Sequence, residues 1–350
     1  MAAFLRNTCM KVTFLSVFLL FFQGLHAQVD LSGLDPFLQR NQKALGNNYV
    51  ALVWKDGKLL YQKQAGEEFT AKTQAPVAAT SMWLTSALVM TFVDEGKISL
   101  DDPVSKYIPT LDKYMKSYIT IRNCLTHTHG VEKDKGVVSK LNDRKKFQNL
   151  EEEVAGIAAK EISNNPGEAF FFSGNGPVLA ARVCEIVGKK SFDRLIQDRI
   201  TRPLKMKGTS FVDDRGYAPN PASGAVSTAN DLINFMNMLL NKGVFENKKI
   251  LSEKAVQELQ QSQFTELPVK FMPAAGSGLD YGLGAWLLEK TENGQGIVVS
   301  SPSLFGTWPI LDNCRKYAAV LFVKSVSNET KRDLGEQFRG IIEEALGECK

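Results

Sequence analysis

The sequence predicts an α+β protein, because strand patterns lie near both ends of the chain and helical patterns fill the middle. Two alternating segments, 49–55 and 58–65, flank Asp56-Gly57, a dipeptide typical of hairpin turns. From Gly276 onward, aromatic and β-branched residues predict three more antiparallel strands. These three segments are 281–290, 296–311 and 316–325.

A long apolar stretch, residues 77–93, predicts a helix that is buried on all sides. It has no charged residue, and apolar side chains occur on every face. Ser and Thr residues interrupt it and Asp94-Glu95 follow at once, which favours a core helix over a membrane span. The other helical patterns cover 35–45, 150–162, 178–187, 191–200 and 328–348, and further helices start at Ser227 or Thr228 and at Ser252.

The first 27 residues predict a secretory signal peptide. They carry Arg6 and Lys11 and no acidic residue, and an apolar run over 12–22 leads to Ala27 just before Gln28. A membrane anchor is the alternative, but the apolar run is short for a span. We therefore expect an exported protein, periplasmic or secreted, with no membrane span once the signal is removed.

Charge and cysteine content narrow the classes of partner. Removing residues 1–27 leaves 40 basic against 38 acidic residues, a balance that argues against nucleic acid. The four remaining cysteines are far apart and have no metal-binding spacing, so we expect no metal and no cofactor. Buried free thiols and disulfides both remain open for them. They are Cys124, Cys184, Cys314 and Cys349.

The segment that follows the apolar helix, GKISLDDPVSKYIP over 96–109, carries a specific resemblance. It is similar to the serine β-lactamase-like hydrolases, which include class C β-lactamases, the penicillin-binding-protein-like DD-peptidases and related esterases. In that family Ser-x-x-Lys opens the helix, and K-[IL]-S-L-D-D-P-V-x-x-Y-[IL]-P follows a glycine. Residues 96–104 and 107–109 match this continuation, and three later segments, 119–130, 202–209 and 224–232, resemble further family elements.

The resemblance implies that the first catalytic motif is lost. Counting back from Gly96 by the family's spacing places the nucleophile at Ala79 and the lysine at Met82. Neither side chain offers a nucleophile, an acid or a base. A rival register uses Ser81 as the nucleophile, but Leu84 then occupies the lysine position, so that serine has no base beside it in sequence.

The second family motif, PG-x-x-F-x-Y-[SG]-[NG], is also altered. Phe172 takes the tyrosine position, which keeps the ring and loses the hydroxyl that relays protons. Gly174 takes the third position, as in some branches of the family. Ser173 and Asn175 are then the candidate polar groups in the cleft.

The third family motif, Lys-Thr-Gly or His-x-Gly, aligns with Ser301-Pro302-Ser303, which offers no cation to a substrate carboxylate. Two histidines, His127 and His129, suggest a base or a metal ligand, but their segment is largely structural in the family. Residues 133–149 are polar and predict a surface loop or a lid.

The resemblance implies an antiparallel sheet flanked by N- and C-terminal helices, with an inserted all-helical subdomain and a cleft between the two parts. The sheet part would be 28–76 plus 276–350, and the inserted part 77–275. We predict an exported, non-catalytic binding protein for a peptide, a muropeptide or other cell-wall fragment, or a partner protein. The alternative is an active serine hydrolase, cleaving a small ester or amide with Ser81 or Ser173. A third hypothesis is an envelope scaffold without cleft function.

Overall fold

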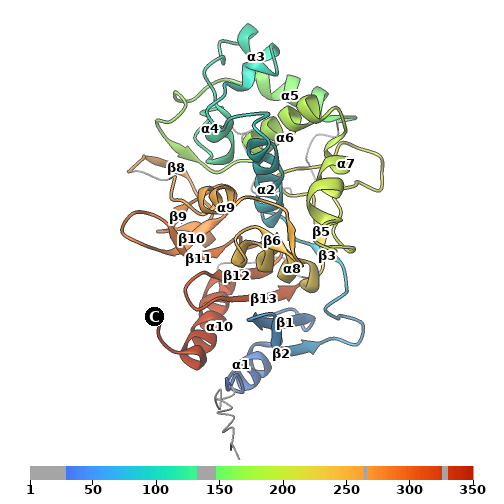
Figure 1. Ribbon diagram of the computed structural model, residues 1–350, viewed down its shortest axis with the longest axis vertical. Helices are drawn as coiled ribbons and strands as arrows, with labels where there is room; N and C mark the ends of the chain where they lie inside the picture. The colour runs from blue at the N-terminus through green and yellow to red at the C-terminus, as the bar shows by residue number, and fades with distance from the viewer. Residues whose placement is uncertain (1–28, 132–146, 264–265, 325–329, 350) are drawn as a thin grey trace, which may run out of the picture.

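The computed structural model describes residues 29–131, 147–263, 266–324 and 330–349. Its centre is a seven-stranded antiparallel sheet in the order β2-β1-β13-β12-β11-β10-β9 (Figure 1). The two ends of the chain meet there, because β1 pairs with β13 from Tyr49↔Val323 to Lys55↔Tyr317. The strands are β1 (Tyr49–Lys55), β2 (Lys58–Ala65), β9 (Asp280–Tyr281), β10 (Trp286–Lys290), β11 (Gly296–Ser300), β12 (Trp308–Asp312) and β13 (Tyr317–Val323).

The N-terminal hairpin forms at the predicted residues, but the C-terminal prediction of three strands is wrong in number. The segment 296–311 folds back on itself as β11 and β12, because Pro302 has no N–H group for a ladder and Gly306 has a φ of +88°. The Ser303 N–H donates to the Thr307 carbonyl (2.8 Å) and closes the turn. The segment 281–290 is likewise broken into β9 and β10 by a turn at residues 282–284.

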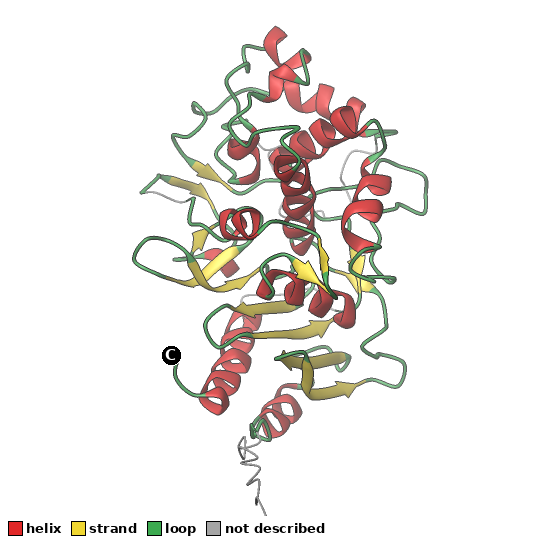
Figure 2. Ribbon diagram, viewed as in Figure 1, coloured by secondary structure: helices red, strands yellow, loops and turns green. Residues whose placement is uncertain are grey.

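Helices cover both faces of the sheet. The terminal helices α1 (Leu34–Asn41) and α10 (Thr330–Leu346) share one core cluster with residues of β1, β12 and β13. The rings of Phe37 and Phe338 lie 6.5 Å apart there. A larger cluster joins the opposite face to the other helices. Figure 2 shows α1 and α10 at one end of the molecule and the helices α3 to α6 at the other. The predicted α+β fold is confirmed.

The long apolar helix is the core of the second cluster. It forms α2 (Thr80–Asp94), three residues later than predicted, and every residue from Thr80 to Phe92 is buried. The remaining helices are α3 (Thr110–Lys113), α4 (Ile121–Leu125), α5 (Leu150–Ala158), α6 (Asn175–Gly188), α7 (Phe192–Ile196), α8 (Ala229–Leu240) and α9 (Glu253–Leu259), with short helical turns at Val104–Lys106, Gln197–Thr201 and Ala274–Gly276. Short strand pairs join β3 (Ala75–Pro76) to β5 (Val226–Ser227), β4 (Phe170–Phe171) to β8 (Val269–Phe271), and β6 (Val244–Phe245) to β7 (Lys248–Lys249).

The predicted division into a sheet part and an inserted helical part stays a prediction. Helix α8 lies within 77–275 and packs against β13 of the sheet. Thr228 and Ser252 cap α8 and α9, as the sequence suggests. The predicted signal peptide and most of the segment 133–149 lie outside the described residues. Within the described ranges, we find no helix that is both long and apolar enough to cross a membrane.

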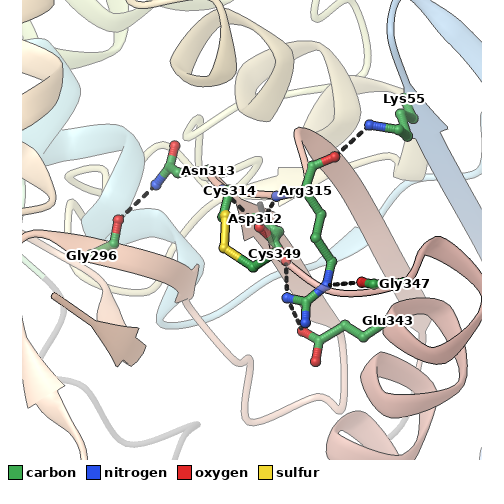
Figure 3. The surroundings of a disulfide bond; sticks show 9 residues. All are labelled: Lys55, Gly296, Asp312, Asn313, Cys314, Arg315, Glu343, Gly347 and Cys349. Atoms are coloured by element: carbon green, nitrogen blue, oxygen red, sulfur yellow. Dashed lines mark hydrogen bonds and ion pairs between the residues drawn. A yellow bond between two sulfur atoms is a disulfide. The ribbon is translucent and has the colours of Figure 1, made fainter.

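A disulfide fastens the end of the chain to the sheet. Cys314, in the turn after β12, is bonded to Cys349 with a Cα–Cα distance of 5.6 Å (Figure 3). Beside it, the Arg315 guanidinium donates to Asp312 (3.0 Å) and to the carbonyl of Gly347 (2.9 Å). Cys124 and Cys184 are buried free thiols. Of the two possibilities that the sequence left open, Cys314 and Cys349 form a disulfide, whereas Cys124 and Cys184 are free thiols.

The contact between α10 and the sheet predicts opposite effects for two glycines of one helix. A Cβ added to Gly335 would lie 2.3 Å from Cδ2 of Trp308, whereas a Cβ on Gly340 meets nothing within 4 Å. We expect Gly335→Ala to lower the free energy of unfolding by about 1–3 kcal/mol through overpacking. Gly340→Ala should raise it by up to about 1 kcal/mol, because alanine favours the helix. Urea denaturation measures both, and equal effects would contradict this packing.

Candidate functional site

The N-terminus of α2 lies against the end of β11. The Thr80 hydroxyl donates to the Ser301 carbonyl (2.7 Å), and the Ser301 hydroxyl lies 3.3 Å from the carbonyl of Ala79. Ala78 has a φ of +40°, which is a strained backbone for a non-glycine residue. Ala79 itself is only partly buried. Two predicted site positions, Ala79 and Ser301, are thus neighbours at the start of α2, where Ala79 is partly exposed.

Met82, one turn into α2, contacts a hydroxyl that sequence reasoning did not single out. The Tyr281 hydroxyl lies 3.9 Å from Sδ of Met82 and 3.1 Å from Nε2 of His127. The backbone N–H of Ser173 reaches Nδ1 of the same histidine at 3.3 Å. A buried chain of hydrogen bonds therefore joins positions from two loops, β9 and α2, and it ends at the sulfur of Met82, which accepts the Tyr281 hydroxyl.

The Phe172 ring is held by an aromatic cluster. It lies 4.4 Å from the His127 ring and stacks on Trp286 at 5.7 Å with an interplanar angle of 24°. Phe170 and Tyr281 also belong to the cluster, and Phe172 is partly buried against it, as are Met272 and Leu279. Because the phenyl ring has no polar group, this position contributes packing and an accessible apolar surface.

His127 and His129 are neutral, and both ring nitrogens of each have a hydrogen-bond partner. Nδ1 of His129 accepts the N–H of Val131 (3.1 Å), so the ring proton is on Nε2 and points to the Ser173 hydroxyl at 3.2 Å. A protonated Nε2 donates to serine and cannot take its proton. His127 has the same arrangement, with Nδ1 as acceptor and Nε2 toward Tyr281. The Ser173–His129 contact therefore lacks the tautomer of a nucleophile–base pair.

The remaining candidate residues lie in different surroundings. The Ser81 side chain is fully buried, and its hydroxyl accepts the N–H of Ala225 (3.0 Å). Ser303 is buried, and its hydroxyl accepts the N–H of Phe305 in the turn after β11. These two serines therefore serve local structure.

Asn175 and Gly174 lie at the start of α6. The Asn175 side-chain oxygen lies 3.4 Å from Nζ of Lys160, a partly buried lysine after α5. Gly174 is exposed, and a Cβ added there would lie 3.2 Å from Ala222. Sequence reasoning missed Lys160, because only the tertiary fold brings this lysine to the second motif. In the described ranges, no group of three or more His, Cys, Asp or Glu side chains is placed to hold a metal.

The buried histidines predict that stability falls in mild acid. Burial lowers the pKa of His127 to about 3 and the pKa of His129 to about 4 from the ordinary 6.5. Below pH 6.5 the unfolded chain binds protons at these rings that the folded chain does not bind until its own lower pKa values are reached. As the pH falls from 6 to 4.5, the free energy of unfolding should therefore decrease by about 1.4 kcal/mol per pH unit for each histidine.

The variant His129→Asn provides the test of this pH dependence, because the amide oxygen can still accept the Val131 N–H. In urea denaturation at several pH values, its slope between pH 6 and 4.5 should be shallower by about 1.4 kcal/mol per pH unit. Between pH 7 and 8 the two chains should have the same slope. An unchanged slope in the acid range would show that His129 is charged in the folded protein.

The sheet, its flanking helices and the buried helix that starts beside the end of β11 define an α+β protein of the β-lactamase and penicillin-binding-protein type. The chain belongs to the β-lactamase family, because the sequence model of the family described as "Beta-lactamase" matches residues 39–342. This is a family of serine hydrolases, and the resemblance noted in the sequence is confirmed.

Curated relatives and solved structures agree with this family. The chain is 24% identical to D-alanyl-D-alanine-carboxypeptidase/endopeptidase AmpH of Escherichia coli K12 over 281 residues, 72% of each chain. It is 27% identical to the teichoic acid D-alanine hydrolase of Staphylococcus aureus over 198 residues, which are 55% of this chain and 47% of the relative. A crystal structure provisionally described as a β-lactamase, from Bacteroides dorei, superimposes with a TM-score of 0.79 at 27% identity and covers 90% of this chain and 99% of that one.

Proposed function

We propose that this protein is a non-catalytic member of the β-lactamase family that binds a peptide or cell-wall fragment at the N-terminus of α2. The observation that carries the proposal is the pair Ala79 and Met82. One is partly accessible at the helix entrance, and the other contacts the Tyr281 hydroxyl through its sulfur atom. A serine and a lysine act there as a unit in the family, so their joint replacement removes most of the acceleration.

The names of the relatives support the kind of ligand. AmpH of Escherichia coli is a D-alanyl-D-alanine carboxypeptidase/endopeptidase, and the Staphylococcus aureus relative is a teichoic acid D-alanine hydrolase. Both names include D-alanine. We infer that the ligand of this chain is a peptide or muropeptide with terminal D-alanine, met after export to the periplasm or outside the cell.

The competing function is an active esterase or amidase that uses Ser81 or Ser173. The contact between Ser173 and His129 at 3.2 Å favours Ser173 of the two. Against it are the 3% exposure of Ser173 and the tautomer of His129. Ser81 has no exposure at all, and the Ala225 N–H occupies its hydroxyl.

Covalent probes separate the two functions. We expect a fluorescent penicillin and a fluorophosphonate to leave the natural chain unlabelled, because the site has no activated hydroxyl. Stoichiometric labelling that disappears in Ser81→Ala or Ser173→Ala would overturn the proposal in favour of an enzyme. Mass spectrometry of the intact protein checks the stoichiometry.

A binding measurement separates the proposal from an envelope scaffold without a ligand. A muropeptide ending in D-Ala-D-Ala, at about 100 times its Kd, should stabilise the natural chain by about 2.7 kcal/mol in a thermal shift assay. Ala79→Trp fills the helix entrance and should abolish the shift. Ala159→Trp, on an exposed position after α5, should leave the shift unchanged. Absence of a shift in the natural chain across muropeptides would favour the scaffold.

A further inference from the structure

A pocket lies where the N-terminal hairpin meets the start of α8. It has a volume of about 730 Å³, in the range of small-molecule sites. Its walls come from the β1–β2 hairpin, the linker that rises from β2 to β3 (Figure 1), the loop before β5, and the first two turns of α8. None of the predicted site residues lines it.

Part of the lining of this pocket is apolar. Leu52 and Ile233 are buried, and Leu59 of β2 lines the pocket with 44% of its surface exposed. Trp54 of β1 is partly buried and pairs with Leu59 across the hairpin. An exposed leucine beside an indole gives a surface that an alkyl chain or a ring can cover.

The lining is also cationic. Lys72, Lys205 and Lys207 belong to it, and all three are exposed. Lys205 is paired with Glu246, whereas Lys72 and Lys207 form no ion pair with any residue that the structure describes. Positive charges that line one pocket raise the local concentration of an anion.

The one carboxylate in the pocket lining does not neutralise these lysines. Oδ2 of Asp231 accepts the backbone N–H of Gly208 (2.8 Å) and the hydroxyl of Thr209 (2.8 Å), and the side chain is 6% exposed. Asp231 is also in the first turn of α8, where the helix dipole compensates a negative charge. Asn230 and Asn234 add uncharged polar groups to the lining.

We propose that this pocket binds a small soluble amphipathic anion, a phosphate or carboxylate carried on an apolar chain or ring. The anionic group lies between Lys72 and Lys207, and the apolar part covers Trp54 and Leu59. The pocket shares no lining residue with the proposed ligand site at the N-terminus of α2, so the proposal goes beyond the proposed function and can be tested separately from it.

Octyl phosphate, below its micelle concentration, is the probe, and tryptophan emission is the readout. Of the four tryptophans, Trp83, Trp286 and Trp308 are at most 3% exposed, so a change in emission reports Trp54. We expect a saturable blue shift with octyl phosphate. Octanol, which lacks the anion, and inorganic phosphate, which lacks the chain, should each bind roughly tenfold more weakly or worse. Equal affinity for octanol and octyl phosphate would overturn the proposal.

Charge variants locate the anion. Lys72→Ala with Lys207→Ala should weaken octyl phosphate binding roughly tenfold or more. The matched pair Lys248→Ala with Lys254→Ala removes two exposed lysines that do not line the pocket, and it should keep the affinity within about twofold. An unchanged affinity for octyl phosphate in the chain with Lys72→Ala and Lys207→Ala would overturn the proposed anion site. Trp54→Phe should remove the emission signal while calorimetry still detects binding.

Two further measurements use the natural chain alone. Raising NaCl from about 0.05 M to about 0.5 M should weaken octyl phosphate binding several-fold, because salt screens exposed lysines. Salt-independent binding would overturn the role of the lysines even if the double variant failed to fold. Binding to phosphatidylglycerol vesicles without binding to octyl phosphate would overturn the soluble ligand in favour of a membrane headgroup.

Discussion

A chain that carries Ala79→Ser together with Met82→Lys is expected to gain covalent labelling by a fluorescent penicillin. Side chains three residues apart lie on one face of a helix, so the new amine lies next to the new hydroxyl. Position 82 is 5% exposed, and burial lowers a lysine pKa, which makes the amine a better base. General-base assistance of this kind is worth about 100-fold or more in rate.

The single variants are the matched controls for this gain. Ala79→Ser alone supplies a hydroxyl without the amine, and Met82→Lys alone supplies the amine without a nucleophile, so neither should be labelled at a measurable rate. Circular dichroism and a thermal melt verify that each variant folds. Strong labelling of the Ala79→Ser chain would show that another residue already serves as base, and the non-catalytic proposal would then be wrong.

Loss of the Cys314–Cys349 disulfide is expected to cost more stability than either glycine substitution in α10. The bond closes a loop with a sequence separation of 35 residues. Opening a loop of this length lowers the free energy of unfolding by about 4 kcal/mol, because the unfolded chain regains entropy. The Cys314→Ser plus Cys349→Ser chain should show this loss in urea denaturation.

A reducing agent provides the control for the disulfide. Dithiothreitol should lower the midpoint of the natural chain to that of the double variant and leave the variant itself unchanged. Cys124 and Cys184 are buried, and burial raises the pKa of both thiols, so they should stay unreactive to thiol reagents in the folded chain. An equal midpoint with and without reductant in the natural chain would contradict the bond.

Much of the architecture was predictable because local patterns carry it. The hairpin at Asp56-Gly57 forms at the predicted residues, since turn chemistry sets its position. The uncharged stretch before Asp94 predicted a buried helix, and α2 confirms it. The C-terminal strands were harder to count, since a continuous apolar pattern does not show where the chain reverses. Pro302 and Gly306 were the available signals.

The candidate site was predictable in part. Spacing from Gly96 singled out Ala79 and Met82, and the fold places the first of them beside Ser301, as the aligned motifs require. The partners of these residues were not predictable. Tyr281 is 199 residues from Met82 in sequence. Lys160 is 15 residues before Asn175, outside the second motif. Neither belongs to a motif with a known spacing.

The sequence alone determines which chemical groups are present at the entrance of the central helix, because covalent order and a fixed helical repeat need no tertiary information. It also determines the strand and helix patterns, since hydrophobic periodicity is local. The tertiary structure determines what those groups touch. Hydrogen bonds among His127, Tyr281 and Ser173, the burial of Ser81 and the pocket beside Trp54 all depend on segments that meet only when the two ends of the chain pair in one sheet.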